Sequence, residues 1–212
     1  MSSDDFDHLH CLETEAIHIL REVAAEFERP VLFFSGRKTC VCLSRLMEKA
    51  FRPSEIPMPL LNIEAGDEPP ELIAFRDRRA RELGARLIVR NVDEALAKGT
   101  IHPFPGHFSR KKLQIPVLLA AIEEFQFDCC IGGARRDEEK ARAKERFFSF
   151  RDAFGQWDPR NQRPEIWNLF NAKLNPRENM RAFPLSNWTE TDVWEYIKKE
   201  KLAVPDIYFG SQ

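Results

Sequence analysis

The stretch PVLFFSGRKTC (residues 30–40) sets the architecture of this chain. Its first half, PVLFF (30–34), is a short continuous apolar run, which is typical of a strand buried on both faces of a parallel sheet. Its second half, SGRKTC (35–40), holds a Ser and a Gly that permit a tight turn, and a helix-like segment follows at 40–51. The stretch therefore predicts a strand, a turn and the start of a helix.

The same alternation of strand and helix recurs along the chain. Residues 9–27 place apolar side chains at three- and four-residue spacing, which predicts an amphipathic helix before the first strand. The remaining segments alternate between strand-like and helix-like, at 59–63, 70–83, 86–90, 112–125 and 127–131. Strands and helices at this spacing form βαβ units with right-handed crossovers. We therefore expect an α/β fold built on a doubly wound, mostly parallel sheet.

The character of the sequence changes after residue 131. Residues 132–146 are highly charged, and residues 157–180 are rich in aromatic residues, Pro and Asn with little periodicity. Order returns at TETD (189–192), which resembles a capping box that opens a helix. We expect an irregular C-terminal extension that packs on the sheet and ends with this helix.

Composition and charge exclude several classes of protein. The 212 residues carry 32 Lys and Arg against 34 Asp and Glu, which gives a net charge of -2. The chain therefore lacks the overall positive charge that is typical of nucleic-acid-binding proteins. No run approaches the roughly 18 apolar residues that a membrane-spanning helix needs. The N-terminal MSSDDFDHLH lacks the features of a secretory signal, so we expect a cytoplasmic protein. The five cysteines lack C-x-x-C spacing, and we expect structural thiols and no protein metal site.

Loops at the carboxyl ends of the strands are where a parallel sheet binds ligands. In the first such loop, Ser35 and Gly36 permit a tight turn, a helix start offers free N–H groups, and Lys38 adds a cation. These are the elements of a phosphate-binding nest. They are also common at ordinary turns between strands and helices, so both interpretations stay open from this loop alone.

The second loop, EAGDEPPE (64–71), combines Gly66 with four acidic residues. Carboxylates that face a phosphate nest hold Mg²⁺ in many proteins, because magnesium prefers oxygen ligands. Acids at the start of a helix also favour its dipole without any ligand, and we favour this simpler interpretation.

The third loop is GGARRDEEKARAKER (132–146). Its two glycines let the backbone pass close to a ligand, and Arg135 and Arg136 follow with forked donors suited to phosphate or sulfate. We therefore expect these two arginines to bind an anion.

Three long strings within the chain are specific enough to indicate a family. They are GGARRDEEKARAKERFFSFRD (132–152), WDPRNQRPEIWNLFN (157–171) and FPLSNWTETDVWEYI (183–197). With them the chain resembles the small, ATP-binding subunit of bacterial sulfate adenylyltransferase. That family lies in the adenine nucleotide alpha-hydrolase group, which also includes the 3'-phosphoadenylyl sulfate reductases.

The resemblance implies a reaction, a cofactor set and a partner. ATP would transfer AMP to sulfate, giving adenylyl sulfate and pyrophosphate, with Mg²⁺ and with the help of a separate GTPase large subunit. We expect residues 1–150 to form the nucleotide-binding α/β domain, and residues 151–212 to form the extension and helix packed on it.

The resemblance also assigns roles to residues. It implies a pyrophosphate loop at 35–40, a second nucleotide loop at Gly66 and an anion-binding segment that starts at Gly133. The residues expected to be catalytic are Lys38, Arg135 and Arg136. Those expected to bind the nucleotide are Ser35, Gly36, Arg37, Lys38, Thr39, Cys40, Gly66 and Gly133.

The chain departs from the family pattern where the chemistry is most exacting. The family's first loop reads close to S-G-G-K-D-S, whereas this chain has Arg37, Thr39 and Cys40 in place of the second Gly, the Asp and the last Ser. A positive φ at position 37 would strain a non-Gly residue by about 1–3 kcal/mol. The second loop, V-D-T-G in the family, reads IEAG (63–66) here. The family also continues past the position of Gln212, so we expect its C-terminal segment to be missing.

Three functional interpretations remain. The first is an adenylyltransferase subunit, active or recently derived from one. The second is a non-catalytic nucleotide-binding or partner-binding relative that keeps the surface for the GTPase, and the third is a thiol enzyme. In the third case Cys40, at a helix N-terminus beside Arg37 and Lys38, would act as the nucleophile.

Overall fold

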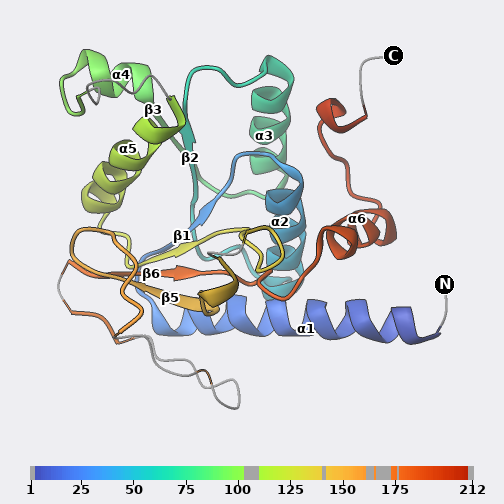
Figure 1. Ribbon diagram of the computed structural model, residues 1–212. Helices are drawn as coiled ribbons and strands as arrows, with labels where there is room; N and C mark the ends of the chain where they lie inside the picture. Colours follow the sequence, from blue (N-terminus) through green and yellow to red (C-terminus); the bar gives the residue numbers. More distant parts are fainter. Residues whose placement is uncertain are drawn as a thin grey trace.

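The centre of the structure is a six-stranded sheet in the order β3-β2-β1-β4-β6-β5 (Figure 1). The computed structural model describes residues 3–102, 110–139, 142–160, 165, 173–175 and 177–209. The strands are β1 (Pro30–Phe33), β2 (Leu60–Glu64), β3 (Leu87–Asn91), β4 (Cys129–Ile131), β5 (Phe148–Arg151) and β6 (Asn179–Ala182). Neighbouring strands run parallel except β5, which pairs antiparallel with β6. The expected mostly parallel α/β sheet is thus confirmed.

Helices cover both faces of the sheet (Figure 1). They are α1 (Ser3–Glu26), α2 (Lys38–Phe51), α3 (Pro70–Glu82), α4 (Val92–Ala97), α5 (Arg110–Phe125) and α6 (Glu190–Lys199), with short 3-10 helices η1 (Arg142–Lys144) and η3 (Asp206–Tyr208). The main apolar core joins α1, α2 and α6 to one face, and a smaller core joins α5 to the other. No helix within the described ranges has the length and apolar character needed to cross a bilayer.

The strand order reverses next to β1. The chain runs from β1 to β2 and β3 on one side, then returns to place β4 on the other side of β1. The carboxyl ends of β1 and β4 therefore flank a topological switch point, which is where open α/β sheets bind ligands.

Two strands and one helix of the structure were not predicted from the sequence. Strands β5 and β6 lie in the part of the chain where no regular pattern was apparent, and β6 pairs directly with β4. Each strand has four residues, and β6 carries Asn179 and Arg181 on buried positions, so neither shows a clear apolar run. Helix α4 has only six residues, too few to show a helical period.

Candidate active site at the switch point

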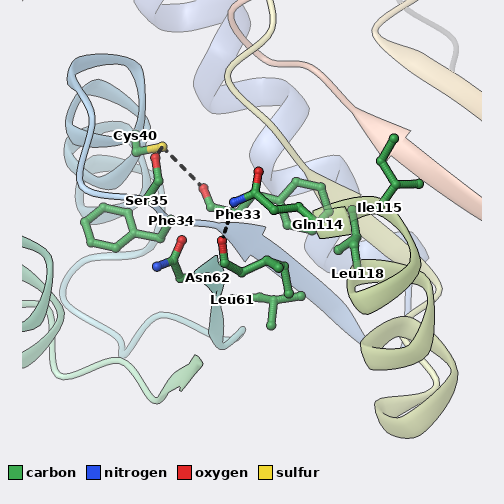
Figure 2. A pocket seen from close by; sticks show the side chains of 10 residues that line it. Phe33, Phe34, Ser35, Cys40, Leu61, Asn62, Gln114, Ile115 and Leu118 are labelled. Carbon is green, nitrogen blue, oxygen red and sulfur yellow. Dashed lines mark hydrogen bonds between the residues drawn. The ribbon is translucent and has the colours of Figure 1, made fainter. Parts of the chain in front are cut away.

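A cleft lies at the carboxyl ends of β1 and β2, with α5 along one part of it and α3 along the other (Figure 2). It has two adjoining parts of about 310 and 300 Å³, and both are lined by Ser35, Asn62, Ile63 and Gln114. Together they have the size of a small-molecule site. Asn62 and Gln114 were not predicted as site residues, although Asn62 is a polar residue inside the apolar run of β2.

One part of the cleft is mainly apolar. Its walls include Phe33 from β1, Leu61 from β2, and Ile115 and Leu118 from α5 (Figure 2). Ile115 is 60% exposed, which is unusual for a large aliphatic side chain and leaves apolar surface at the cleft available to a ligand. This part suits a flat aromatic group such as a nucleobase.

The other part is polar. Arg37 from the first loop, Glu68 from the second and Arg76 from α3 line it. It therefore brings the first two predicted loops to one place, beside the apolar part. A cleft with an apolar end and a charged end has the character that a nucleotide requires.

The turn of the first loop depends on Gly36. This residue has a φ of +78°, and a Cβ atom there would lie 3.1 Å from the Cβ of Arg76 and 3.3 Å from the carbonyl oxygen of Leu72. Arg37 instead has an ordinary φ of -73°. Position 37 therefore needs no glycine, and the expected backbone strain at Arg37 is absent because the left-handed residue is Gly36.

Cys40 lies on the wall of the cleft, at the start of α2. Its Sγ lies 3.5 Å from the Ser35 Oγ and donates to the Phe33 carbonyl oxygen at 3.5 Å (Figure 2). The side chain is buried apart from 8% of the residue surface. Ser35 and Cys40, both predicted nucleotide-binding residues, are thus in contact at the edge of the cleft.

Lys38 points toward α6 and η3. Its Nζ forms an ion pair with Glu190 and lies 5.1 Å from the ring centre of Trp194. Its backbone N–H donates to the Tyr208 hydroxyl at 3.2 Å. The charge and the N–H group expected to bind phosphate are therefore both engaged by residues from the end of the chain, and sequence reasoning found neither Glu190 nor Tyr208.

Glu190 brings two of the predicted catalytic residues together. One carboxylate oxygen accepts from Lys38, and the other accepts from Arg135 at 2.8 Å. Arg135 is 5% exposed and also bonds Asp137 at 3.1 Å. Burial raises the pKa of Glu190, but hydrogen bonds from Lys38 and Trp194 outweigh that effect and hold the pKa below its usual range. The carboxylate is therefore charged at neutral pH.

Arg136 lies apart from this group. Its guanidinium donates to the Asn187 side chain and stacks 5.0 Å from the ring centre of Phe147. Gly133, in contrast, lies against the first loop, because a Cβ atom there would come within 2.9 Å of the Thr39 Cβ and Oγ1. Thr39 and Gly133 are thus packed together, whereas Arg136 is turned to other partners.

The second loop is held by its own acids. The Glu68 carboxylate accepts from the backbone N–H groups of Ala65 at 2.7 Å and Gly66 at 2.9 Å. Gly66 has a φ of +87°, which strains any residue with a side chain, and a Cβ atom there would displace the Arg110 guanidinium, which would lie 2.5 Å away. Glu64 pairs with Arg76 at 2.7 Å. Within the described ranges, no group of three or more His, Cys, Asp and Glu could hold a metal ion.

Cys42 in α2 and Cys129 and Cys130 in β4 have no exposed surface. Burial raises the pKa of the Cys42 thiol to about 12 and that of the Cys130 thiol to about 11, and it raises the pKa of Cys129 well above its usual value. These thiols stay protonated and unreactive at neutral pH.

Known proteins resemble this chain over nearly its whole length. The pattern of the phosphoadenosine phosphosulfate reductase domain family matches residues 29–211. A protein named sulfate adenylyltransferase subunit 2, from Mycolicibacterium vanbaalenii, is 54% identical over 98% of this chain and 67% of its own length. The chain thus spans about two thirds of the length of that relative.

Solved structures share the fold at low sequence identity. Phosphoadenylyl-sulfate reductase from Candida auris has a TM-score of 0.60 and 16% identity, and the match covers 99% of this chain and 92% of that protein. FMN adenylyltransferase from Candida glabrata, solved with FMN and an ATP analogue, has a TM-score of 0.66 and 12% identity, over 98% of this chain and 63% of that protein.

Proposed function

Because this chain belongs to the phosphoadenosine phosphosulfate reductase domain family, we propose that it is the nucleotidyltransferase subunit of a sulfate adenylyltransferase. The observation that carries the proposal is the match, at 54% identity across the chain, to a protein of that name. In the reaction, an oxygen of sulfate attacks the α-phosphorus of ATP. A bond forms between that oxygen and the phosphorus, the bond from the α-phosphorus to the bridging oxygen breaks, and pyrophosphate leaves.

The cleft supports this proposal through its two-part character. The adenine ring would lie against Phe33, Leu61 and Leu118, and the phosphates would point to the polar part and the loop at 35–40. The N–H groups at the start of α2 would face the phosphates once Lys38 exchanges its N–H contact with Tyr208, because the left-handed Gly36 turns the chain shortly before the helix.

Lys38, Arg135 and Arg136 are the proposed cations of the reaction. Lys38 would exchange its contact with Glu190 for the pyrophosphate that leaves, a step in which negative charge develops. Arg135 would keep Glu190 in place meanwhile. Sulfate is already an anionic nucleophile, so the reaction needs no general base.

Mg²⁺ and a partner subunit belong to the same proposal. Two acids of the second loop are engaged, Glu68 with backbone N–H groups and Glu64 with Arg76, and no described group of three or more His, Cys, Asp and Glu forms a ready-made metal site. The ion would be held chiefly by the phosphates of ATP. The relatives are named subunit 2, which supports the existence of a partner subunit. We propose that this partner is a GTPase large subunit, which drives formation of the high-energy mixed anhydride. We also propose that the protein acts in the cytoplasm.

A second candidate function is nucleotide binding without turnover. The specific observation in its favour is that the Glu190 carboxylate pairs with both Lys38 and Arg135. The replacements at Arg37, Thr39 and Cys40 would then mark a loop that has lost its reaction while the scaffold is kept.

Calorimetry and a turnover assay separate these candidates. The chain would be titrated with ATP and Mg²⁺, alone and with a sulfate adenylyltransferase large subunit, and sulfate-dependent pyrophosphate release would be measured in the same mixtures. Binding with sulfate-dependent release supports the first function, and binding without release supports the second. Absence of ATP binding in both mixtures would contradict both. Arg78→Gln, at an exposed residue of α3, is the control variant.

A further inference from the structure

Arg181 is a buried arginine without a described partner. It lies in the middle of β6, only 8% of its surface is exposed, and its guanidinium NH1 is buried with no hydrogen bond. Among the described residues, none accepts a hydrogen bond from this guanidinium. The buried arginines Arg76 and Arg135, in contrast, each contact two carboxylates. An unpaired buried charge is costly, so its presence calls for a physical reason.

The position of Arg181 relates it to the switch point. Arg181 pairs with Cys130 of β4, which pairs with Val31 of β1, so all three lie side by side across the sheet. The Arg181 guanidinium reaches over β4 toward the end of β1, where it lies 5.0 Å from the ring centre of Phe33. Phe33 lines the apolar part of the cleft (Figure 2). The guanidinium and β2 therefore lie on opposite sides of Phe33. The guanidinium is on the β4 side, next to the point where the strand order reverses.

The backbone next to this ring carries no side chain. A Cβ atom at Gly132, directly after β4, would lie 3.3 Å from the Phe183 ring and 3.8 Å from the Phe33 ring. The glycine thus lets both rings lie close to the backbone at the carboxyl end of β4. A small ligand at the switch point would meet the Phe33 ring, the Gly132 backbone and the Arg181 guanidinium together.

The other buried or half-buried cations near the cleft are already engaged, and Arg37, which lines the polar part without a described side-chain partner, is exposed. Lys38 and Arg135 share Glu190, and Arg136 donates to Asn187. Arg181 alone among these four lacks a described polar partner. Stacking on Phe33 also fixes one face of its guanidinium and leaves the N–H edge for a ligand. Forked N–H donors of this kind suit a tetrahedral oxyanion such as sulfate or phosphate.

We propose that Arg181 binds the acceptor oxyanion, sulfate, and holds it on the β4 side of Phe33 while the nucleotide occupies the β2 side. This inference rests on the proposed function. It divides the switch point between the two substrates, with Phe33 as the wall between them. The cation that holds sulfate then lies outside the loop at 35–40. The sulfate oxygens in turn supply the hydrogen-bond acceptors that the buried guanidinium lacks.

A purely structural role makes a different prediction. The Oδ1 of Asn179, two residues before Arg181 and on the same face of β6, is also buried without a partner. A water between Asn179 and Arg181 would satisfy both groups without any ligand. In that case the loss of the guanidinium would change stability but not the response to sulfate.

The test compares Arg181→Met and Arg181→Lys with Arg90→Met. Arg90 also stacks on a phenylalanine ring, 4.9 Å from the centre of Phe125, but it pairs with Glu124 and lies on β3, away from the switch point. Three quantities would be measured: the ATP affinity by calorimetry, the sulfate KM for pyrophosphate release with the large subunit, and the rise in melting temperature caused by sodium sulfate relative to sodium chloride at equal ionic strength.

The Met variant should raise the sulfate KM at least about tenfold, which corresponds to ~1.4 kcal/mol of binding. It should abolish the sulfate-specific rise in melting temperature, and its ATP affinity should stay within about twofold of the unaltered chain. The Lys variant keeps the positive charge but loses the forked N–H donors of the guanidinium. Its sulfate KM should therefore lie between that of the unaltered chain and that of the Met variant. The control variant should retain both sulfate responses.

Unchanged sulfate responses in a folded Arg181 variant would overturn the assignment, and so would a loss of ATP affinity as large as the loss for sulfate. If the Met variant does not fold, the same two measurements on the Lys variant, the sulfate KM and the sulfate-specific rise in melting temperature, test the assignment. If the unaltered chain neither binds ATP nor releases pyrophosphate, the proposed function fails. The melting-temperature comparison then decides separately whether Arg181 binds the oxyanion.

Discussion

The hydroxyl of Tyr208 accepts a hydrogen bond of 3.2 Å from the backbone N–H of Lys38, the first residue of α2. The N–H groups at a helix start are the donors that bind phosphate. Tyr208 therefore occupies one of these donors, and its ring lies 5.6 Å from the Lys38 Nζ as well. A phosphate at this helix start and the Tyr208 hydroxyl compete for the same hydrogen.

Tyr208→Phe should strengthen the binding of pyrophosphate. The variant keeps the ring but removes the oxygen that competes for the Lys38 N–H, and a hydrogen bond is worth about 0.5–1.5 kcal/mol. We expect the dissociation constant to fall about two- to tenfold, as measured by calorimetry. Phe209→Leu, at an exposed neighbour, is the control and should leave the constant unchanged. Weaker binding by Tyr208→Phe would show that the hydroxyl helps to hold the ligand instead.

The sequence predicted the layers of the fold better than it predicted the partners of the charges. Alternating apolar strands and helices report burial, so they located β1 to β4 together with α1, α2, α3 and α5. Ion pairs join residues far apart in the chain, and nothing local in the sequence indicates that Glu190 contacts Lys38 across 152 positions. The loop at 35–40 was recognised by its residues, whereas its contacts with α6 and η3 required the tertiary structure.

Arg181 illustrates the same limit. A charged residue in a four-residue strand hides the apolar pattern that would reveal the strand, so β6 and its buried cation went unpredicted together. A signal was nevertheless present, because the neighbouring Met180 and Ala182 alternate with polar residues as in a strand of period two.

Alkaline pH should destabilise the fold through its buried thiols. The pKa values of Cys42 and Cys130 rise to about 12 and about 11 because of burial, whereas an unfolded thiol has a pKa of about 8.5. Between pH 9 and 11 the unfolded chain therefore binds fewer protons than the folded chain. The free energy of unfolding should fall with pH, by up to about 1.4 kcal/mol per pH unit for each thiol.

Urea unfolding at pH 8, 9 and 10 would measure this slope. Cys130→Ala should make the slope shallower, even though the loss of a buried side chain lowers stability at every pH. Cys11→Ala, at the exposed cysteine, should leave the slope unchanged. Equal slopes in all three proteins would show that other groups cause the alkaline effect.

Gly133→Ala should disturb the start of α2. The new methyl group would lie 2.9 Å from the Thr39 Cβ, so one of the two segments must move. We expect the free energy of unfolding to fall by about 1–3 kcal/mol, the usual range for overpacking. The double variant Gly133→Ala, Thr39→Gly removes the obstructing side chain and should recover part of that loss. Additive effects in this double-mutant cycle would contradict the proposed contact.

The last prediction concerns the altered loop itself. We expect weak adenylyltransferase activity, and we expect the triple variant Arg37→Gly, Thr39→Asp, Cys40→Ser to raise the rate of ATP formation from adenylyl sulfate and pyrophosphate at least about tenfold, or ~1.4 kcal/mol of barrier. The structure indicates which of the three substitutions should increase the rate. Arg37 has an ordinary φ, so Arg37→Gly relieves no strain, and the added flexibility should cost about 0.5–1 kcal/mol of stability.

The gain should therefore come from positions 39 and 40. Cys40 lines the apolar part of the cleft and Thr39 packs against Gly133, whereas Arg37 lines the polar part with an exposed side chain. The double variant Thr39→Asp, Cys40→Ser should match the triple variant within about twofold, and Arg37→Gly alone should leave the rate unchanged or lower it. A gain that follows Arg37→Gly alone would place the defect in the long side chain at the rim. An unaltered chain that already turns over at ~1–1000 per second would show that the loop is not impaired at all.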